Sequence, residues 1–170
     1  IQAGLPACFW SYAGPHYCFL ENTEWTSDQP SSWYYTHDSE FAGKRLPFGC
    51  KVIIKPASTK GVELGKMEGQ TITGILVGYE THPGYSWHGE YLVIGIDEFV
   101  GYSLAADAKA MDFSHASPHR VKSLELPEEG IVFPLKAEYD RMNHTLQGRI
   151  ENAVQNDVFA MPPDFSNPEE

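Results

Sequence analysis

Three apolar runs rich in β-branched residues lie close together in the chain, at residues 49 to 56, 71 to 80 and 90 to 97. They contain the stretches VII, TITGILVGY and EYLVIGI, whose composition is typical of strands covered on both faces. Parallel pairing of consecutive strands requires a crossover of a dozen or more residues, whereas closely spaced runs joined by turns pair antiparallel. The three runs therefore predict a small antiparallel sheet.

The glycines of the second run and a weaker fourth run indicate how this sheet is completed. Gly74 and Gly78 lie inside the second run, and glycines within strands commonly mark bulges or the tight coiling of a small barrel. Residues 119 to 126 alternate imperfectly before Pro127 and predict an edge strand. We expect an α+β fold with a barrel-like antiparallel sheet, flanked by an N-terminal and a C-terminal helix.

Helical spacing is found on both sides of the strand region. Near the N-terminus, Phe9, Ala13, Tyr17 and Leu20 recur at helical intervals, and Pro15 among them predicts a kink or a restart of the helix. A second amphipathic pattern predicts a C-terminal helix of about five turns, and its apolar positions are Leu135, Tyr139, Met142, Leu146, Ile150 and Val154.

These patterns divide the chain into three segments. Residues 1 to 45 hold the N-terminal helix and an irregular linker with room for one short element. Residues 46 to 130 form the small barrel, and residues 131 to 170 form the C-terminal helix and an acidic, proline-rich tail. Because 170 residues suffice for one domain but not for two large ones, we expect one main core with appendages.

Charge and cysteine content restrict the partners and the compartment. The net charge is -11, from 23 acidic and 12 basic residues, so binding to duplex DNA is disfavoured. No apolar run reaches about 18 residues, so we expect no membrane span. Cys8, Cys18 and Cys50 cannot all pair, which favours an intracellular, reducing compartment or organelle over secretion. The start lacks a signal peptide and an initiator Met, so we interpret the chain as a fragment or processed product.

Cys50 follows Phe48 and Gly49 at the start of the first strand and allows two interpretations. A nucleophilic cysteine needs a nearby base or a helix N-terminus to form its thiolate. The alternative, which we prefer, is a buried thiol that packs beside Phe48. Zinc ligands are available in Cys8, His16 and Cys18, or in His115 and His119, but neither set has the spacing of a known zinc motif. We therefore predict no metal site.

The sequence HPGYSWHGEY, between the second and third runs, predicts a hairpin whose turn contains Pro83 and Gly84. Tyr85, Trp87 and His88 are candidates for a binding surface on this loop. Two alternatives remain: a hard-cation site that includes His82 and Glu90, or a Trp87 side chain that folds back as a lid over the barrel.

Several motifs resemble one protein family when they are taken in order. They are GLPACFW at residues 4 to 10, Asn22, FGC at residues 48 to 50 and GILVGY at residues 74 to 79. This order resembles the region of copia-type retrotransposon integrases just beyond the catalytic core. The hairpin sequence also resembles a variant seen in divergent, protist copia-like reading frames. The resemblance covers about residues 4 to 100.

The resemblance implies that the FGC motif begins the first strand of a small post-catalytic domain and carries no chemistry. Integrases of this family bind divalent metal through two Asp and one Glu in the core upstream, so the resemblance implies that no residue of this chain is catalytic and that it needs no cofactor. The motif residues are then structural, and they are Phe48, Gly49, Cys50, Gly74 and Gly78.

Two hypotheses of function follow. The first is a non-catalytic protein-binding or scaffold module, derived from the post-catalytic region of a copia-type integrase and acting as a subunit of a larger complex. The second is the C-terminal part of an active integrase that assists DNA integration. The acidic charge and the aromatic-rich hairpin favour the first, whereas the order of the motifs favours the second as ancestry.

Overall fold

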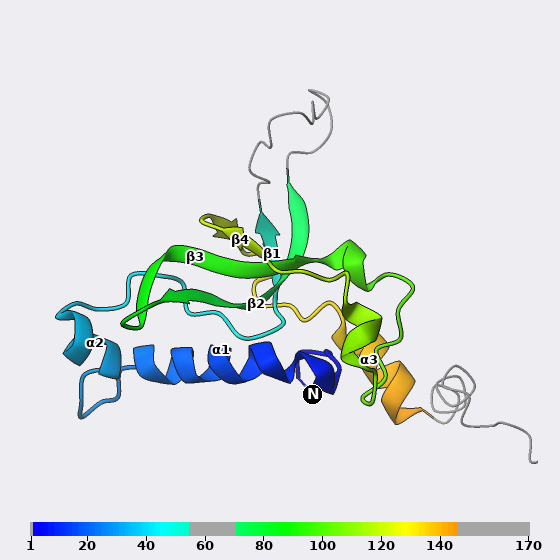
Figure 1. Ribbon diagram of the computed structural model, residues 1–170, viewed down its shortest axis with the longest axis horizontal. Coiled ribbons are helices and arrows are strands. Elements are labelled where there is room, and N and C mark those ends of the chain that lie inside the picture. The colour runs from blue at the N-terminus through cyan, green and yellow to red at the C-terminus, as the bar shows by residue number, and fades with distance from the viewer. Residues whose placement is uncertain (1, 55–70, 146–170) are drawn as a thin grey trace, which may run out of the picture.

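Five antiparallel strands form the centre of the computed structural model, which describes residues 2–54 and 71–145. Their spatial order is β4-β3-β2-β1-β5. Helix α1 (Trp10–Thr23) lies along the sheet, and α3 (Lys136–His144) lies at one end of it (Figure 1). The predicted α+β class is therefore confirmed. The strands are β1 (Lys51–Ile54), β2 (Ile72–His82), β3 (Ser86–Gly95), β4 (His119–Val121) and β5 (Leu124–Glu125).

The sheet curls because one short segment pairs with both of its sides. β4 pairs with β3, and β5, which begins only three residues after β4 ends, pairs with β1. The single edge strand predicted over residues 119 to 126 is therefore wrong, since the segment forms two strands separated by Lys122 and Ser123. For both pairings to form, β1 and β3 must lie on either side of this segment. The result is the barrel-like sheet that the sequence predicts.

The β2–β3 hairpin is longer than predicted. β2 continues to His82 and β3 begins at Ser86, so the turn is reduced to Pro83, Gly84 and Tyr85. The predicted start of the third strand at residue 90 is wrong, because β3 begins at Ser86, and Ser86 and Trp87 pair with His82 and Thr81 across the hairpin. Trp87 and His88 consequently belong to β3 and not to the loop.

Gly78 and Gly74 have different roles in β2. The pairs Leu76 with Val93 and Gly78 with Leu92 leave Val77 as an extra residue, which is a bulge next to Gly78 as predicted. The bulge turns Tyr79 to the same side of the sheet as Leu76. Gly74 pairs regularly, and a Cβ there would lie 2.3 Å from a Val93 methyl group. Gly74 therefore permits close packing across the strands.

Helix α1 runs through Pro15 without interruption, so the predicted restart at this residue is wrong. Pro15 is exposed, and so is Ser11, whose carbonyl lies opposite the backbone nitrogen of Pro15 that has no hydrogen to donate. The buried side of the helix contains His16, Phe19 and Thr23. Tyr17, which belongs to the predicted apolar spacing, is exposed to solvent, so its predicted place on the buried face is wrong.

Apolar residues cover both faces of β2, as predicted from its near-continuous hydrophobicity. One group of buried residues connects the start of α1 and α3 to the sheet, and we call it the α3-side cluster. The other connects the end of α1 to the opposite face. The α3-side cluster includes Phe9, Ile75, Val77, Ile94, Phe99, Leu104, Phe113, Leu135 and Tyr139. The second group includes Phe19, Trp33, Leu46, Cys50, Val52, Leu76, Tyr79, Tyr91, Val93 and Leu124.

Short helical elements and α3 complete the described chain. The predicted C-terminal helix is confirmed over α3, whereas its expected positions Leu146, Ile150 and Val154 lie outside the described residues. None of the helices in the described part has the length and apolar character needed to cross a membrane. The short elements are η1 (Ala7–Phe9), α2 (Ser32–His37), η2 (Ile96–Phe99) and η3 (Ala110–Phe113).

Candidate functional site

Aromatic side chains from α1, α2, the linker and the hairpin meet at one end of the molecule. Phe19 stacks on Tyr79 with ring centroids 4.4 Å apart, and its edge contacts Trp33 and Phe41 at 5.8 and 5.2 Å. Such aromatic pairs contribute to the free energy of folding in addition to the contribution of the apolar area that they bury. We call this group the aromatic cluster, and it comprises Phe19, Trp33, Phe41, Tyr79, Trp87 and Tyr91.

Trp87 belongs to this cluster and covers its outer side. Its ring centroid lies 4.8 Å from that of Phe41 and 5.2 Å from that of Tyr91. The indole Nε1 donates a hydrogen bond of 2.8 Å to the carbonyl of Glu90, so the polar end of the side chain is satisfied within the hairpin. This is the arrangement of the lid, which the sequence left open as an alternative to an interface anchor.

Tyr85 is the residue of the candidate set that lies in the turn itself. Its backbone has a positive φ of 58°, and its side chain folds back toward α1. The hydroxyl accepts a hydrogen bond of 3.0 Å from Asn22, and the ring lies 5.9 Å from Phe19. Tyr85 still exposes 38% of its surface, so it joins the hairpin to the surface at the end of α1.

A second aromatic group lies on the outside of this end and was not selected from the sequence. Trp25 contacts Tyr34 edge to face at 5.5 Å, and Tyr34 contacts Tyr35 in the same way at 6.4 Å. Trp25 is 46% exposed and Tyr35 is 71% exposed. Exposed tryptophan and tyrosine that touch one another are typical of protein-binding surfaces.

The local sequence explains why these rings are held in place. Ser31 caps α2 by accepting a hydrogen bond of 3.1 Å from the Tyr34 amide, and Trp33 anchors the helix in the aromatic cluster. α2 ends at Asp38, which adopts the left-handed conformation and donates its amide to the Tyr34 carbonyl at 2.8 Å. With Trp33 buried, Tyr35 on the same short helix faces solvent.

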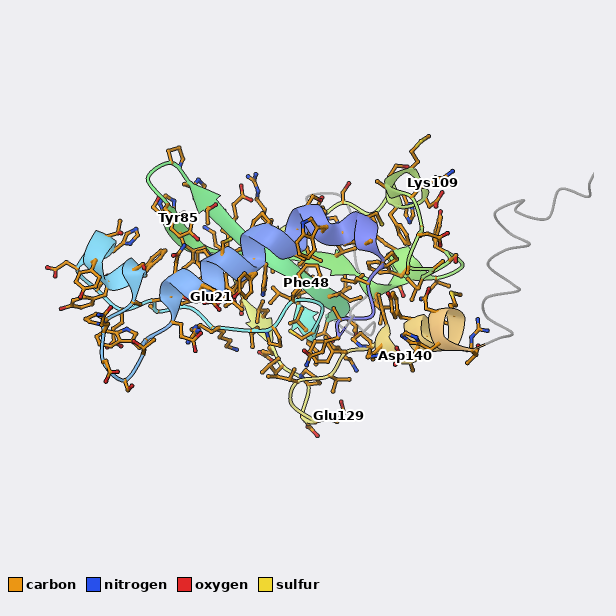
Figure 2. The ribbon with its side chains drawn as sticks, turned by 90° about the horizontal axis from the view of Figure 1, so that it is seen from below. Glu21, Phe48, Tyr85, Lys109, Glu129 and Asp140 are labelled. Atoms are coloured by element: carbon orange, nitrogen blue, oxygen red, sulfur yellow. The ribbon has the colours of Figure 1, made fainter. Side chains whose placement is uncertain are left out.

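The segment that carries the exposed rings is acidic. Residues 17 to 40 contain no lysine or arginine, and their acidic side chains are all exposed. The negative charge of Glu21, one turn after Tyr17 on α1, raises the pKa of the Tyr17 hydroxyl. Figure 2 shows Glu21 and Tyr85 toward the α2 end of the molecule, opposite Lys109 and Asp140. We call Trp25, Tyr34 and Tyr35, together with Glu21, Glu24, Asp28 and Asp38, the acidic aromatic surface.

The signal for this surface was present in the sequence as the stretches NTEW and SSWYY. Both stretches lie in the segment interpreted as an irregular linker with room for one short element, and α2 is that element. A serine followed by three aromatic residues predicts a capped turn of helix with one ring inside and its neighbours outside. Only the fold, however, brings Trp25 against Tyr34.

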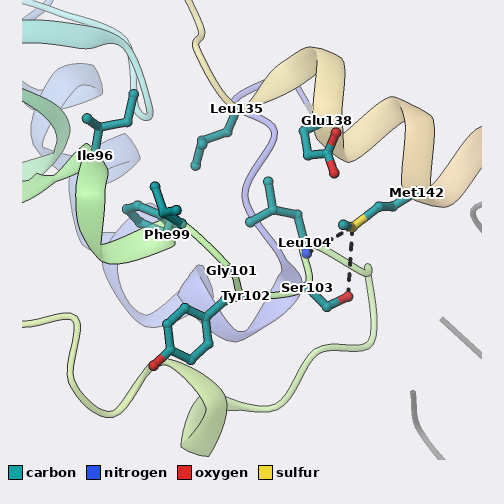
Figure 3. Close-up of a pocket in the computed structure, with 10 residues that line it drawn as sticks. Ile96, Phe99, Gly101, Tyr102, Ser103, Leu104, Leu135, Glu138 and Met142 are labelled. Atoms are coloured by element: carbon teal, nitrogen blue, oxygen red, sulfur yellow. Dashed lines mark hydrogen bonds between the residues drawn. The ribbon is translucent and has the colours of Figure 1, made fainter. Parts of the chain in front are cut away.

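An apolar cleft of about 440 Å³ lies at the other end of the molecule (Figure 3). It is formed by the segment after β3 and by α3, where the Met142 sulfur accepts a hydrogen bond of 3.2 Å from the Leu104 amide. Glu138 at its rim forms an ion pair with Arg141. The cleft offers apolar contact area rather than reactive groups, and its lining residues are Ile96, Phe99, Val100, Gly101, Tyr102, Ser103, Leu104, Leu135, Glu138 and Met142.

The FGC motif is a structural junction. Gly49 has a φ of 80° and donates its amide to the Leu76 carbonyl at 2.8 Å, and a Cβ at this position would lie 2.4 Å from that of Ala3. Phe48 packs edge to face on His16 at 5.6 Å. Cys50 is fully buried, and burial raises the pKa of its thiol to about 11. A neutral, enclosed thiol is a poor nucleophile, in agreement with the interpretation of Cys50 as a packing residue.

We expect the three cysteines to react with a maleimide at very different rates. Cys18 is exposed and should react first, and Cys8 should react more slowly because burial raises the pKa of its thiol. Cys50 should react only after denaturation. Mass spectrometry of timed samples at neutral pH measures the order, with Cys18→Ser as the control that removes the fast phase. If Cys50 reacted in the native protein as fast as Cys18, the packing interpretation would be wrong.

The histidines considered as ligands have other contacts. His82 and His88 stack at 4.3 Å, and His82 Nε2 lies 3.9 Å from a Glu90 carboxylate oxygen. His115 and His119 both contact Glu98. His115 Nε2 lies 2.8 Å from the backbone carbonyl oxygen of Glu98, and His119 Nε2 lies 3.5 Å from its carboxylate. Within residues 2–54 and 71–145, no group of three or more His, Cys, Asp or Glu side chains is placed to hold a metal ion.

We interpret this end of the molecule as a candidate binding surface. The aromatic cluster fixes the ends of α1, α2 and the hairpin relative to one another, and the acidic aromatic surface presents rings and carboxylates from that rigid base. Comparison of the chain with known proteins found no family model, no curated protein and no solved structure that matches it.

Proposed function

We propose that this chain is a non-catalytic protein-binding or scaffold module, a subunit of a larger complex, whose ancestry lies in the post-catalytic region of a copia-type integrase. One observation carries the proposal: Trp25 and Tyr35 are exposed and connected through Tyr34, and Tyr34 and Tyr35 lie on α2, which the buried Trp33 anchors in the aromatic cluster. Rigid aromatic side chains lose little conformational entropy on binding, so they are favoured at the centres of protein interfaces.

The hairpin contributes to the same end of the molecule. Tyr85 is bound to Asn22, at the end of α1, and remains partly exposed, so it extends the surface beyond Trp25 and Tyr35. His88, the third residue of the candidate set, is exposed on β3 of the same hairpin. Trp87 packs against Phe41 and so holds the hairpin in place relative to the linker.

The alternative is the C-terminal part of an active integrase that assists DNA integration. The order of the GLPACFW, FGC and GILVGY motifs favours it. The charges oppose it, because phosphate contacts require available cations and many of the described cations are paired with carboxylates. These paired residues are Arg45, Arg120, Lys122, Lys136 and Arg141.

Capture of a partner, combined with a DNA-binding measurement, tests the proposal. The tagged chain should retain a protein from native extract, and Trp25→Ala/Tyr35→Ala should lose it while remaining folded. Trp10→Ala is the matched control, since Trp10 is even more exposed but lies at the other end of α1. The captured protein is then purified, and its affinity is measured for the wild-type chain, for Trp25→Ala/Tyr35→Ala and for Trp10→Ala.

A gel-shift assay with a generic duplex decides between the two functions. We expect weak or no binding at about 0.15 M salt, because the net charge of -11 leaves few phosphate contacts and screening weakens those that remain. Micromolar binding to the duplex at this salt concentration, together with unchanged protein capture by the double variant, would favour the integrase alternative.

A further inference from the structure

The acidic aromatic surface has features that specify the chemistry of its partner. We infer that it binds a segment of polypeptide rich in lysine and arginine, an inference that rests on the proposed protein-binding function. Its exposed rings, Trp25 and Tyr35, offer π-faces, and the guanidinium of arginine and the ammonium of lysine are attracted to such faces within about 6 Å of the ring centre. The hydrocarbon stems of the same side chains cover the ring edges.

The end of α1 adds a second attraction for cations. The carbonyls of the last turn carry the negative end of the helix dipole; Glu21 lies in that turn, and Glu24 follows it directly as the cap residue. The chain already places one guanidinium there: Arg45 Nη2 lies 3.3 Å from a Glu24 carboxylate oxygen and also donates a hydrogen bond of 3.3 Å to the Leu20 carbonyl. This internal contact is an example, within the chain, of a guanidinium held by a carboxylate and a carbonyl at the end of α1.

Charge also argues against other occupants of the surface. A second copy of the chain would bring the same exposed carboxylates against themselves, and each copy carries a net charge of -11. Nucleic acid and anionic lipid are repelled for the same reason. A cationic peptide is attracted from a distance, so its association should be fast at low salt and should weaken as salt is added.

Fluorescence anisotropy with synthetic peptides tests the inference on the full chain. The probe is a fluorescein-labelled 12-residue peptide in which Arg and Lys alternate with Gly and Ser. The comparison peptides carry citrulline and acetyl-lysine in place of the cations, which preserves the shape and removes the charge. We expect the cationic peptide to bind at 50 mM salt, with at least tenfold weaker binding at 300 mM salt and for the uncharged peptide.

Two double variants separate the contributions of rings and carboxylates. Trp25→Ala/Tyr35→Ala should weaken binding about tenfold through the loss of two cation–π contacts. Asp28→Asn/Asp38→Asn should weaken it at 50 mM salt and reduce its salt dependence. The matched control is Glu128→Gln/Glu129→Gln, which changes the net charge equally at exposed positions on a loop away from α2 (Figure 2). Circular dichroism and thermal melting establish that each variant is folded.

The inference is overturned if the wild-type chain does not bind the cationic peptide, if the uncharged peptide binds equally well, or if the control variant loses as much affinity as Asp28→Asn/Asp38→Asn. Concentration-dependent dimerisation that disappears in Trp25→Ala/Tyr35→Ala would also overturn it, in favour of a second copy. If the cationic peptide fails while a captured partner still depends on Trp25 and Tyr35, the protein-binding function stands and only the cationic chemistry is wrong.

Discussion

Replacement of Trp87 by Ala is expected to lower the free energy of unfolding by about 3 kcal/mol, which corresponds to a fall in Tm of roughly 6–12 °C. Trp87 packs on Phe41 and Tyr91 and donates its Nε1 hydrogen to the Glu90 carbonyl. Truncation removes the cover of the aromatic cluster and admits water to it. Urea denaturation and thermal melting of the purified protein measure the change.

Trp10→Ala is the matched control for this substitution. Trp10 has 76% of its surface exposed at the start of α1, so the same change of side chain there should alter the free energy of unfolding by no more than about 0.5 kcal/mol. Folded Trp87→Ala should still bind the partner through Trp25 and Tyr35. If Trp87→Ala instead lost the partner with an unchanged Tm, Trp87 would be an interface anchor and the lid arrangement would be wrong.

Acidification is expected to destabilise the protein through His16. This side chain is buried on α1, and its Nε2 lies 3.0 Å from the Leu46 carbonyl; because a carbonyl only accepts, Nε2 carries the hydrogen. Nδ1 is then unprotonated, enclosed beside the rings of Phe48 and Tyr79, and has no hydrogen-bond partner among the described residues. Burial lowers the pKa of His16 from 6.5 to about 4, since a charged imidazole would be desolvated there.

The sign of the effect follows from proton binding. Between pH 6.5 and 4 the unfolded chain binds a proton at His16 and the folded chain does not, so stability is complete above pH 6.5 and falls as the pH is lowered. The pKa difference corresponds to a loss of about 3 kcal/mol over this range.

His16→Gln isolates this contribution, because its amide can still donate to Leu46 but does not titrate. The free energy of unfolding of wild type minus that of the variant, from urea titrations at four pH values between 7.5 and 4, should decrease by about 3 kcal/mol as the pH falls. Carboxylates that titrate near pH 4 affect both proteins and cancel in the difference. A difference that stays constant over this range would contradict the burial of a neutral His16.

The strands and helices were predicted where their own residues specify them. β1, the central part of β2 and the end of β3 are near-continuous β-branched runs, and Gly78 marked the bulge correctly. The start of β3 was missed because Trp87 and His88 are neither β-branched nor regularly alternating. Ser86 and Trp87 pair with His82 and Thr81 only because β2 continues opposite them. The face of α1 was assigned wrongly, since Tyr17 and His16 fit helical spacing almost equally well.

The candidate site was predicted less completely than the fold. The hairpin residues Tyr85, Trp87 and His88 were selected for their chemistry, but their exposure depends on partners far away in the sequence, such as Asn22 for Tyr85 and Phe41 for Trp87. The acidic aromatic surface escaped selection for the same reason. Its residues occur in two short stretches without periodicity, and they form one surface only after α2 has turned back against the end of α1.

The antiparallel strands, the flanking helices and the acidic charge follow from the sequence alone, because backbone preference depends on neighbouring residues and net charge on composition. Three further features depend on contacts between distant segments: the division of residues 119 to 126 between β3 and β1, the inward position of Trp87, and the contact of Trp25 with Tyr34. Each of these features brings together segments that are separate in the sequence. The loss of conformational entropy on bringing them together is offset only when the two segments bury apolar area or pair their backbones, so no local sequence pattern shows which segments will meet.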